Sequence, residues 1–217
     1  MKITLLHMDD YFVICEKPVG VSSESPGLPE LIREQSGFPV YPVHRLDRTT
    51  GGICILARSP DACARLQKLF QTHRIEKRYY AVIAGKPQTE TGVFDDYLYH
   101  DKKKNKTYVV KRMRKGVRDA RCEWELLDSV MTADISLSLI SIRLDTGRTH
   151  QIRVQFSSRG YPLAGDQKYG SRVKAPSPAL WATRISFPHP YIKDKMIDVS
   201  SMPPAVYPWN CFEKLNL

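Results

Sequence analysis

Short apolar segments of strand length limit the fold of this chain more than any other feature. Residues 53–57, 79–84, 122–128 and 135–144 are rich in aliphatic and aromatic side chains, and we predict a strand in each. Such segments outnumber the predicted helices and do not alternate strictly with them. We therefore predict an α+β fold with a largely antiparallel sheet, rather than a doubly wound parallel one.

The remaining local signals are turns, caps and one helix. Residues 3–16 are predicted to form two short strands, and residues 21–30 have the Ser, Pro and Gly content of a loop. Ser59 followed by Pro60 is typical of a helix start, and the helix should run to about His73. The apolar phase shifts near Leu139, which indicates either a bulge or a strand buried on both faces.

The bulk properties describe an ordinary globular chain of 217 residues, 42% of them hydrophobic. We find no internal repeat and no long linker, so residues 1–217 are predicted to form one domain. The five cysteines form no Cys-x-x-Cys pair, and the six histidines are scattered. We expect a reducing compartment and no metal site. No signal peptide or membrane-spanning stretch is visible, and a cytoplasmic monomer is expected.

The net charge of +10 allows two interpretations, a highly soluble protein or a protein that binds a polyanion. The distribution of the charge along the chain favours a protein that binds a polyanion. Between residues 102 and 121 there are ten of the 33 basic residues and only one acid, Asp119. We call residues 101–121 the basic arm and predict a projecting hairpin. The cations predicted to contact the phosphates of such a polyanion are Lys102, Lys103, Lys104, Lys106, Lys111 and Arg112. The alternative is a solvated surface loop.

Three polar motifs have residues that carry chemistry. In the first, Asp47 lies between Arg45 and Arg48, just before a predicted buried strand. Nearby guanidinium groups would favour its ionised form, as a nucleophile or base requires. Taken alone, the pattern also fits a structural ion pair.

The other two motifs follow the last predicted strand. Residues 143–154 contain Gly147 for a turn and Thr149 as a possible cap of a short helix, where Arg148 and the first amides would form an anion site. A capped helix with a solvated face is the alternative. Residues 165–170 form a glycine-bounded loop, which alone is a weak signal.

Together these motifs resemble those of the RluA family of RNA pseudouridine synthases. The family's signature is similar to His44-Arg45-Leu46-Asp47-Arg48, and its later motifs to residues 77–82, 147–153 and 165–170. Weaker resemblances occur at residues 16–20 and 187–190, so the likeness extends from about residue 6 to residue 205. It implies the pseudouridine synthase fold and an isomerase that needs no cofactor.

The resemblance also implies roles for individual residues. Asp47 would be the catalytic aspartate, Tyr79 would stack on the uracil, and Arg153 would pair with the aspartate. Arg45 would fill the gap left by the flipped uridine. The remaining implied substrate contacts are Arg48, Arg148, Ile152 and Leu180. The expected partner is ribosomal RNA or a transfer RNA stem-loop.

The chain departs from the family pattern in several places. Gly51 stands where serine is common, and Gln155 and Trp181 stand where histidine is common. None belongs to the implied catalytic set, so we expect activity to survive them. We also expect a stand-alone catalytic domain, because there is no room before Lys17 for the small S4 RNA-binding domain of many relatives. The basic arm would then supply part of the RNA binding that the S4 domain provides in those relatives.

Three alternatives are open at this point. The first is a catalytically inactive RNA-binding protein of the same fold, against which the intact Asp47, Tyr79 and Arg153 argue. The second is a hydrolase that pairs Asp47 with Asp145 or Asp166. It explains neither the basic arm nor the joint occurrence of the motifs. The third is a structural interaction module.

Overall fold

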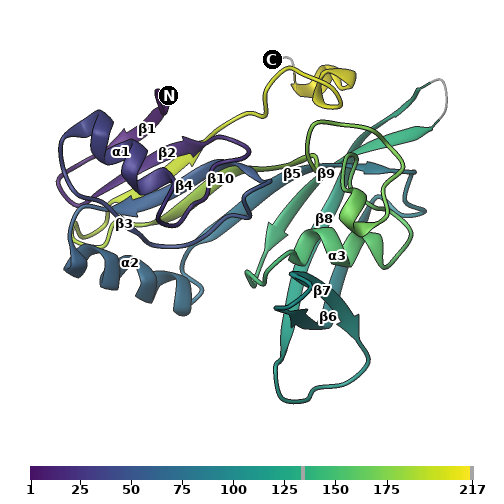
Figure 1. Ribbon diagram of the computed structural model, residues 1–217, viewed down its shortest axis with the longest axis horizontal. Coiled ribbons are helices and arrows are strands. Elements are labelled where there is room, and N and C mark those ends of the chain that lie inside the picture. Colours follow the sequence, from purple (N-terminus) through teal and green to yellow (C-terminus); the bar gives the residue numbers. More distant parts are fainter. Residues whose placement is uncertain (133–134, 216–217) are drawn as a thin grey trace. The chain divides into compact units, whose positions relative to one another are not determined.

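The chain folds into two compact units in the computed structural model, which describes residues 1–132 and 135–215 (Figure 1). The first unit contains residues 1–77 and 181–203. The second contains residues 78–180 and the C-terminal segment that starts at Pro204. The expectation of one catalytic domain stays a prediction.

The first unit is built on strands from both ends of its sequence. β2 (Phe12–Lys17) pairs antiparallel with β1 (Leu5–Met8) and with β4 (Gly51–Ala57), as the two predicted N-terminal strands require. β10 (Leu180–Pro188) pairs parallel with β4 and antiparallel with β11 (Met196–Ser200). The short β3 (Tyr41–Pro42) also pairs with β4. Every residue of β4 is buried, which makes this strand the centre of the core.

Two helices complete the first unit. α2 (Pro60–Gln71) begins as predicted, because the Ser59 hydroxyl accepts a hydrogen bond from the Ala62 N–H at 3.1 Å. α1 (Leu28–Ser36) is a correction, since the prediction assigned residues 21–30 to a loop. Proline fits the first turn of a helix, and the Glu30 carboxylate accepts from the Gly27 N–H at 2.6 Å.

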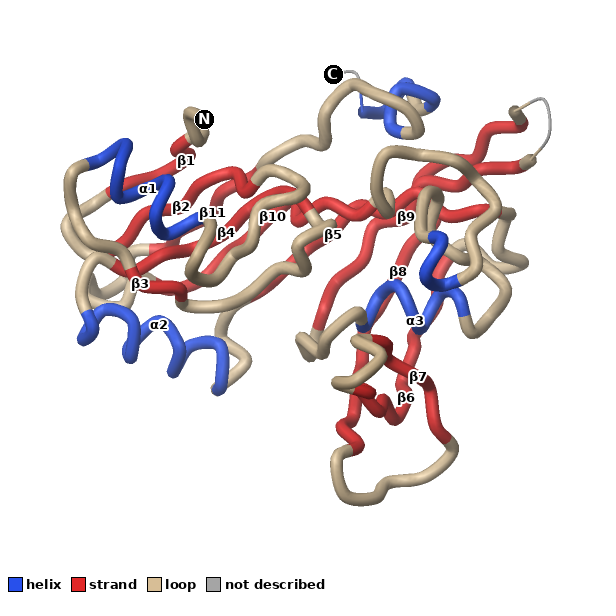
Figure 2. The backbone as a smooth tube through the Cα atoms, in the orientation of Figure 1, coloured by secondary structure: helices blue, strands red, loops and turns tan. Residues whose placement is uncertain are grey.

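The second unit is an antiparallel sheet in the order β5-β9-β8-β6-β7 (Figure 2). Its strands are β5 (Glu76–Ala84), β9 (Ser136–Leu144), β8 (Val117–Met131), β6 (Thr91–Asp101) and β7 (Lys106–Val110). The predicted irregularity near Leu139 is present as a register shift, but the extra residue lies in β8, between Leu126 and Asp128. The α+β class and the largely antiparallel sheet are confirmed.

The helix α3 (Gln151–Ser157) packs against the strands of the second unit. The Phe156 ring lies 4.9 Å from Phe94 and 6.0 Å from Trp124, measured between ring centroids. Three short 3-10 helices cover Gln167–Tyr169, Trp209–Cys211 and Glu213–Leu215. No described helix is long and apolar enough to cross a membrane.

Candidate active site

The loop that carries Asp47 is held by backbone contacts on both sides of the aspartate. The Leu46 N–H donates to the Ser23 hydroxyl oxygen at 3.2 Å, and that hydroxyl donates to the Leu46 carbonyl at 3.0 Å. After the aspartate, the Thr50 N–H donates to the Asp47 carbonyl at 2.9 Å. Asp47 is half-buried. A carboxylate on such a loop has little freedom to move, as a catalytic group requires.

His44 ties the same loop to the core. Its Nε2 accepts a hydrogen bond from the Ile55 N–H at 3.1 Å, and its ring stacks on Phe70 at 4.8 Å. Burial lowers the pKa of His44 to about 3, and the charge of Lys77 adds to the effect. The ring is therefore neutral near pH 7, which leaves the Nε2 lone pair available to accept. This histidine is a structural member of the signature.

Lys17 is a buried cation beside this loop, and the sequence analysis did not single it out. Its side chain is inaccessible to solvent, and Nζ donates to the carbonyls of Pro18 at 3.0 Å, Val21 at 2.9 Å and Arg48 at 3.5 Å. Burial lowers the pKa of Lys17 to about 8, and the Asp47 carboxylate is among the groups that limit the decrease. A positive charge thus favours ionised Asp47 from within the first unit.

The two arginines of the signature are exposed but differ in their contacts. Arg48 donates from Nε to the Gly20 carbonyl at 2.7 Å, which joins the Asp47 loop to the turn after β2. Arg45 is 59% exposed and has a loose ion pair with Glu24 at 3.7 Å. An exposed arginine with one weak partner can change position at low cost, so the role predicted for Arg45 is compatible with its surroundings.

The second unit holds the other residues of the predicted set. Tyr79 lies on β5 opposite Ile142 of β9 and is 8% exposed. Ile152 on α3 and Leu180 at the start of β10 are also buried. Arg153 follows Ile152 and is buried too, with a side chain 5% exposed.

Arg153 has a bidentate ion pair with Asp166. Nε donates to Oδ2 at 2.6 Å and Nη2 to Oδ1 at 2.8 Å, and both side chains are buried. This two-point geometry fixes the guanidinium plane more firmly than a single contact would. The pairing of Arg153 with Asp47 stays a prediction.

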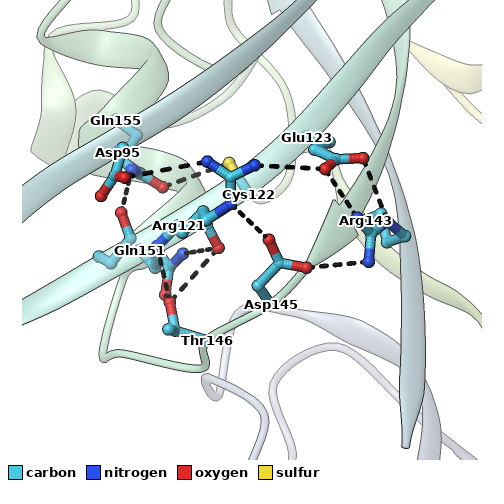
Figure 3. Close-up of polar contacts among 10 residues, drawn as sticks. Asp95, Arg121, Cys122, Glu123, Arg143, Asp145, Thr146, Gln151 and Gln155 are labelled. Atoms are coloured by element: carbon cyan, nitrogen blue, oxygen red, sulfur yellow. Dashed lines mark hydrogen bonds and ion pairs between the residues drawn. The ribbon is translucent and has the colours of Figure 1, made fainter. Parts of the chain in front are cut away.

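The motif at residues 145–151 is bound to β8 (Figure 3). Gln151 Nε2 donates to the Arg121 carbonyl at 3.1 Å, while its Oε1 accepts from the Thr146 hydroxyl at 2.8 Å and the Arg148 N–H at 3.0 Å. The Arg121 N–H in turn donates to the Thr146 hydroxyl at 2.9 Å. These contacts set the position from which α3 begins.

Asp145 belongs to a network of ion pairs on this sheet (Figure 3). It contacts Arg121 Nε at 3.0 Å and Arg143 Nη1 at 2.9 Å, and both arginines also contact Glu123. The Asp145 carboxylate is thus occupied by two guanidinium groups, and the Asp166 carboxylate by the Arg153 guanidinium. These contacts argue against the hydrolase alternative, which needs one of these acids.

The contacts of Arg148 and Thr149 differ in part from those predicted for an anion site. Arg148 donates from Nε to the Asp119 carbonyl at 2.8 Å and from Nη2 to its carboxylate at 3.1 Å. The cap prediction for Thr149 is wrong, because α3 starts at Gln151 and His150 occupies the cap position with a left-handed φ of 55°. The Thr149 carbonyl instead accepts a hydrogen bond from the Thr107 hydroxyl at 2.8 Å.

The basic arm is attached to α3 through Tyr169. The Thr107 N–H of β7 donates to the Tyr169 oxygen at 2.8 Å, and the Tyr169 hydroxyl shares a hydrogen bond with Nδ1 of His150, also at 2.8 Å. Burial lowers the pKa of His150 to about 3, with the charge of Arg153 next in importance, so the ring is neutral near pH 7. The Tyr169 ring lies 5.1 Å from the Arg153 guanidinium carbon.

Most cations of the basic arm lie in two connections, residues 102–105 and 111–116, whereas Lys106 is in β7 and Arg118 and Arg121 are in β8. Lys106 is opposite Asp101 in the β6-β7 pair, and Val117 is opposite Tyr99 in the β6-β8 pair, so residues 102–105 and 111–116 turn at the same end of β6. Most of these cations are exposed. In the described part of the chain, none of the six cations predicted to contact phosphates has an ion pair. β6 and β7 form a hairpin whose turn belongs to the basic arm, while the projection of the arm from the protein and its contact with phosphates stay predictions.

Two of the departures from the family pattern compensate each other. Trp181 lies opposite Gly51 in the β4-β10 pair, and a Cβ on Gly51 would lie 2.2 Å from the Trp181 ring. The large ring thus occupies the space that a serine would need. The third departure, Gln155, is buried and donates to Asp96 at 2.9 Å and to the Ala120 carbonyl at 3.1 Å.

The predicted set is thus divided between the two units. Arg45, Asp47 and Arg48 lie on one loop of the first unit with Lys17 beneath it. Tyr79, Arg148, Ile152, Arg153 and Leu180 belong to the second. Their union in one site stays a prediction. Among the described residues, no cluster of three histidine, cysteine or acidic side chains could hold a metal ion.

Comparison with known proteins gives a consistent result. Residues 11–158 match the family described as RNA pseudouridylate synthase. An uncharacterized RNA pseudouridine synthase of Haemophilus influenzae is 31% identical, over 100% of this chain and 96% of that one. A tRNA pseudouridine synthase C of Vibrio parahaemolyticus is 25% identical, over 93% and 91%.

Solved structures show the same fold. Human RNA Pseudouridylate Synthase Domain Containing 1 superposes with a TM-score of 0.81 at 20% identity, covering 94% of this chain and 85% of that one. Human RNA Pseudouridylate Synthase Domain Containing 4 gives 0.75 at 24% identity, covering 93% and 88%. The fold is the pseudouridine synthase fold of RNA-modifying isomerases. The chain belongs to the RNA pseudouridylate synthase family, of the RluA type that its motifs indicated.

Proposed function

We propose that this protein isomerises uridine to pseudouridine in a structured RNA, either ribosomal RNA or a transfer RNA stem-loop, with Asp47 as its catalytic carboxylate. The observation that carries the proposal is the Asp47 loop. Its backbone is bound to Ser23 and Arg48 is bound to Gly20, while the Lys17 ammonium lies close enough to favour the ionised aspartate. A structural ion pair alone would not require so fixed a backbone.

The reaction needs one ionised carboxylate and a firm hold on a detached base. The bond between N1 of uracil and C1′ of ribose breaks, the base turns over, and a new bond joins C5 to C1′. The proton on C5 is lost to solvent and N1 gains one, so the product is an isomer of the substrate. Asp47 would act as nucleophile or base in this sequence. We expect no cofactor to be needed.

The remaining residues would bind and orient the uridine. Tyr79 would stack on the uracil, and Arg153, oriented by Asp166, would pair with Asp47. Ile152 and Leu180 would supply apolar walls, and Arg48 and Arg148 further substrate contacts. Arg45 would occupy the gap that the flipped uridine leaves, for which its exposed side chain is suited.

The basic arm would position the RNA without selecting its sequence. Its cations Lys102, Lys103, Lys104, Lys106, Lys111 and Arg112 would contact backbone phosphates, because lysine contacts of this kind give affinity and orientation. We expect the protein to act as a monomer in the cytoplasm.

The test is tritium release from RNA labelled at uridine C5, with total transfer RNA and ribosomal RNA as separate substrates. We expect release by the native protein and none by Asp47→Asn, which keeps the shape of the side chain and removes its charge. RNA affinity of the variant should stay within about tenfold, or about 1.4 kcal/mol. If activity and tight binding were lost together, Asp47 would be structural. No release from any RNA pool by the native protein would favour the inactive RNA-binding alternative.

A further inference from the structure

A second group of unpaired cations lies in the first unit, around a hollow of about 560 Å³. The hollow is lined by the end of α2 and by the loop that joins β10 to β11. Its lining contains three cations, Arg74, Lys193 and Lys195, and one acid, Asp194, which gives it a net charge of +2. We call this site the basic hollow; it comprises Arg74 and the loop of residues 188–196.

The three cations differ from the paired arginines of this unit and are grouped around one hollow. Arg58, Arg65 and Arg184 each have an ion pair, with Asp10, Asp61 and Asp198 respectively. In the described ranges, Arg74, Lys193 and Lys195 have none, and all three are exposed. Grouping like charges without partners raises the energy of the folded protein, and an anionic ligand relieves this cost.

The loop of the basic hollow is organised by a buried histidine. His189 Nδ1 accepts from the N–H groups of Tyr191 at 3.1 Å and Ile192 at 3.0 Å, and its Nε2 donates to Asp9 at 2.9 Å. Asp9 also accepts from the N–H groups of Tyr11 at 2.8 Å and Phe12 at 3.0 Å. The histidine of the landmark at residues 187–190 thus joins the loop to the first strands.

An aromatic stack also fixes the loop of the basic hollow. Tyr191 lies on Tyr11 with ring centroids 3.9 Å apart, and the Arg65 guanidinium lies 4.5 Å from the Tyr191 ring. The Tyr191 hydroxyl contacts Asp61 at the start of α2. The backbone that presents Lys193 and Lys195 is therefore fixed before any ligand binds, which lowers the entropy cost of binding.

Apolar side chains also line the hollow. Leu69, Ile192 and Met196 are among them, and Ile192, at 44% exposure, and Met196, at 60%, are among the more exposed large apolar side chains. A free phosphate ion would contact only the cations. A polynucleotide would place phosphates on the cations and sugar or base surface on these apolar side chains.

We propose that the basic hollow is a second RNA-contact surface, which binds backbone phosphates away from the nucleotide that is modified. This inference rests on the proposed function, because it takes RNA as the partner. It assigns a purpose to the Phe187-Pro188-His189-Pro190 landmark, in which His189 shapes a cationic loop and takes no part in the chemistry.

The test measures RNA affinity as a function of salt, by fluorescence anisotropy with a labelled transfer RNA between about 50 and 200 mM KCl. The variant is Lys193→Gln/Lys195→Gln. The matched control is Lys2→Gln/Arg33→Gln, which removes the same charge from exposed positions of the same unit outside the hollow. Thermal unfolding should show unchanged midpoints, since these side chains have no ion pair in the described structure.

We expect the slope of log K against log salt to fall by about two in the hollow variant, roughly one for each lost phosphate contact. Adding Arg74→Gln should lower it further, while the control keeps the native slope. An unchanged slope in the hollow variant, or an equal change in the control, would overturn the inference. Tritium release by the native protein is measured in parallel, so a failure of the proposed function is recognised separately.

Discussion

At the scale of single residues, the contact between Gly51 and Trp181 shows how one departure from a family pattern can require another. The two residues face each other across β4 and β10, and the Trp181 Nε1–H donates to the Ser201 hydroxyl at 3.0 Å. The tryptophan is therefore fixed from its far side and cannot move away from a larger neighbour.

Gly51→Ser should accordingly lower the free energy of unfolding by about 1–3 kcal/mol, the usual cost of overpacking a core. Trp181→His alone should also destabilise, because it leaves a cavity. Together the two changes should cost less than the sum of the single ones. Chemical denaturation of all four proteins measures this coupling. Strict additivity would mean that the contact does not restrict residue choice.

His150 is the residue whose protonation we expect to limit stability in acid. Its pKa of about 3 in the folded protein lies below the usual value of 6.5, mainly because the ring is buried. Below pH 6.5 the unfolded chain therefore binds a proton that the folded chain does not. The contribution of His150 to stability is complete above pH 6.5 and is lost as the pH falls toward 3, by at most about 1.4 kcal/mol per pH unit.

His150→Asn should make the pH dependence of unfolding shallower between pH 6.5 and 4. Asparagine tolerates the left-handed φ of 55°, and its amide group can take the place of Nδ1 in the hydrogen bond with the Tyr169 hydroxyl. Denaturant titrations at several pH values give the slope for both proteins. The same slope in both would assign the acid sensitivity to other groups, such as His44.

At the scale of elements, the basic arm is a charged hairpin with a neutral attachment. Thr107, Tyr169 and His150 join it to α3 through hydrogen bonds, whereas most of its cations lie on the turns. Only Lys106, in β7, lies near the attachment among the described cations of the arm, 5.4 Å from the Tyr169 ring. The charge on the turns and the attachment can therefore be altered separately. This separation allows the arm to be tested as an RNA-binding element rather than as a solvated loop.

Neutralising Lys102, Lys103, Lys104 and Lys106 to Gln should weaken RNA binding and lower the salt slope by up to about four. Tyr169→Phe should weaken binding through a less fixed arm but leave the slope unchanged, because no charge is removed. Both slopes follow from anisotropy titrations with the same RNA. If the fourfold variant keeps the native slope, the arm does not contact phosphates.

The elements also show what could and could not be predicted from the sequence. Residues 53–57 and 79–84 were predicted as strands because their apolar side chains are contiguous. α1 was missed because Pro29 suggested a loop, although proline also suits a first helical turn. β6 was missed because only Phe94 and Leu98 of its residues are well buried, which leaves no clear alternation.

For the site, motif resemblance identified the residues but not their surroundings. Lys17 is an example, because lysine is almost always exposed and nothing local in the sequence indicates burial. Its three carbonyl acceptors come together only when the turn after β2 meets the Asp47 loop. The partnership of Arg153 with Asp166 likewise depends on how residues 165–170 fold back on α3.

At the scale of the whole molecule, we expect the net charge of +10 to promote the binding of a polyanion. The basic arm and the basic hollow both present cations without ion pairs in the described structure, whereas other arginines, such as Arg65, Arg153 and Arg184, are paired. We expect retention on heparin at low salt and elution at a salt concentration that falls in the fourfold arm variant. Passage of the native protein through heparin at about 50 mM salt would mean that the charge serves solubility alone.

The parallel pairing of β10 with β4 has a consequence for synthesis on the ribosome. Trp181 and Ala182 pair with β4, but residues 58–180 are translated after β4 and before this pair. At 5–20 residues per second, that interval lasts roughly 6 to 25 s. The nascent first unit must therefore keep its most buried strand with one edge open while another unit emerges. For this chain, the order of translation and the order of sheet completion are different.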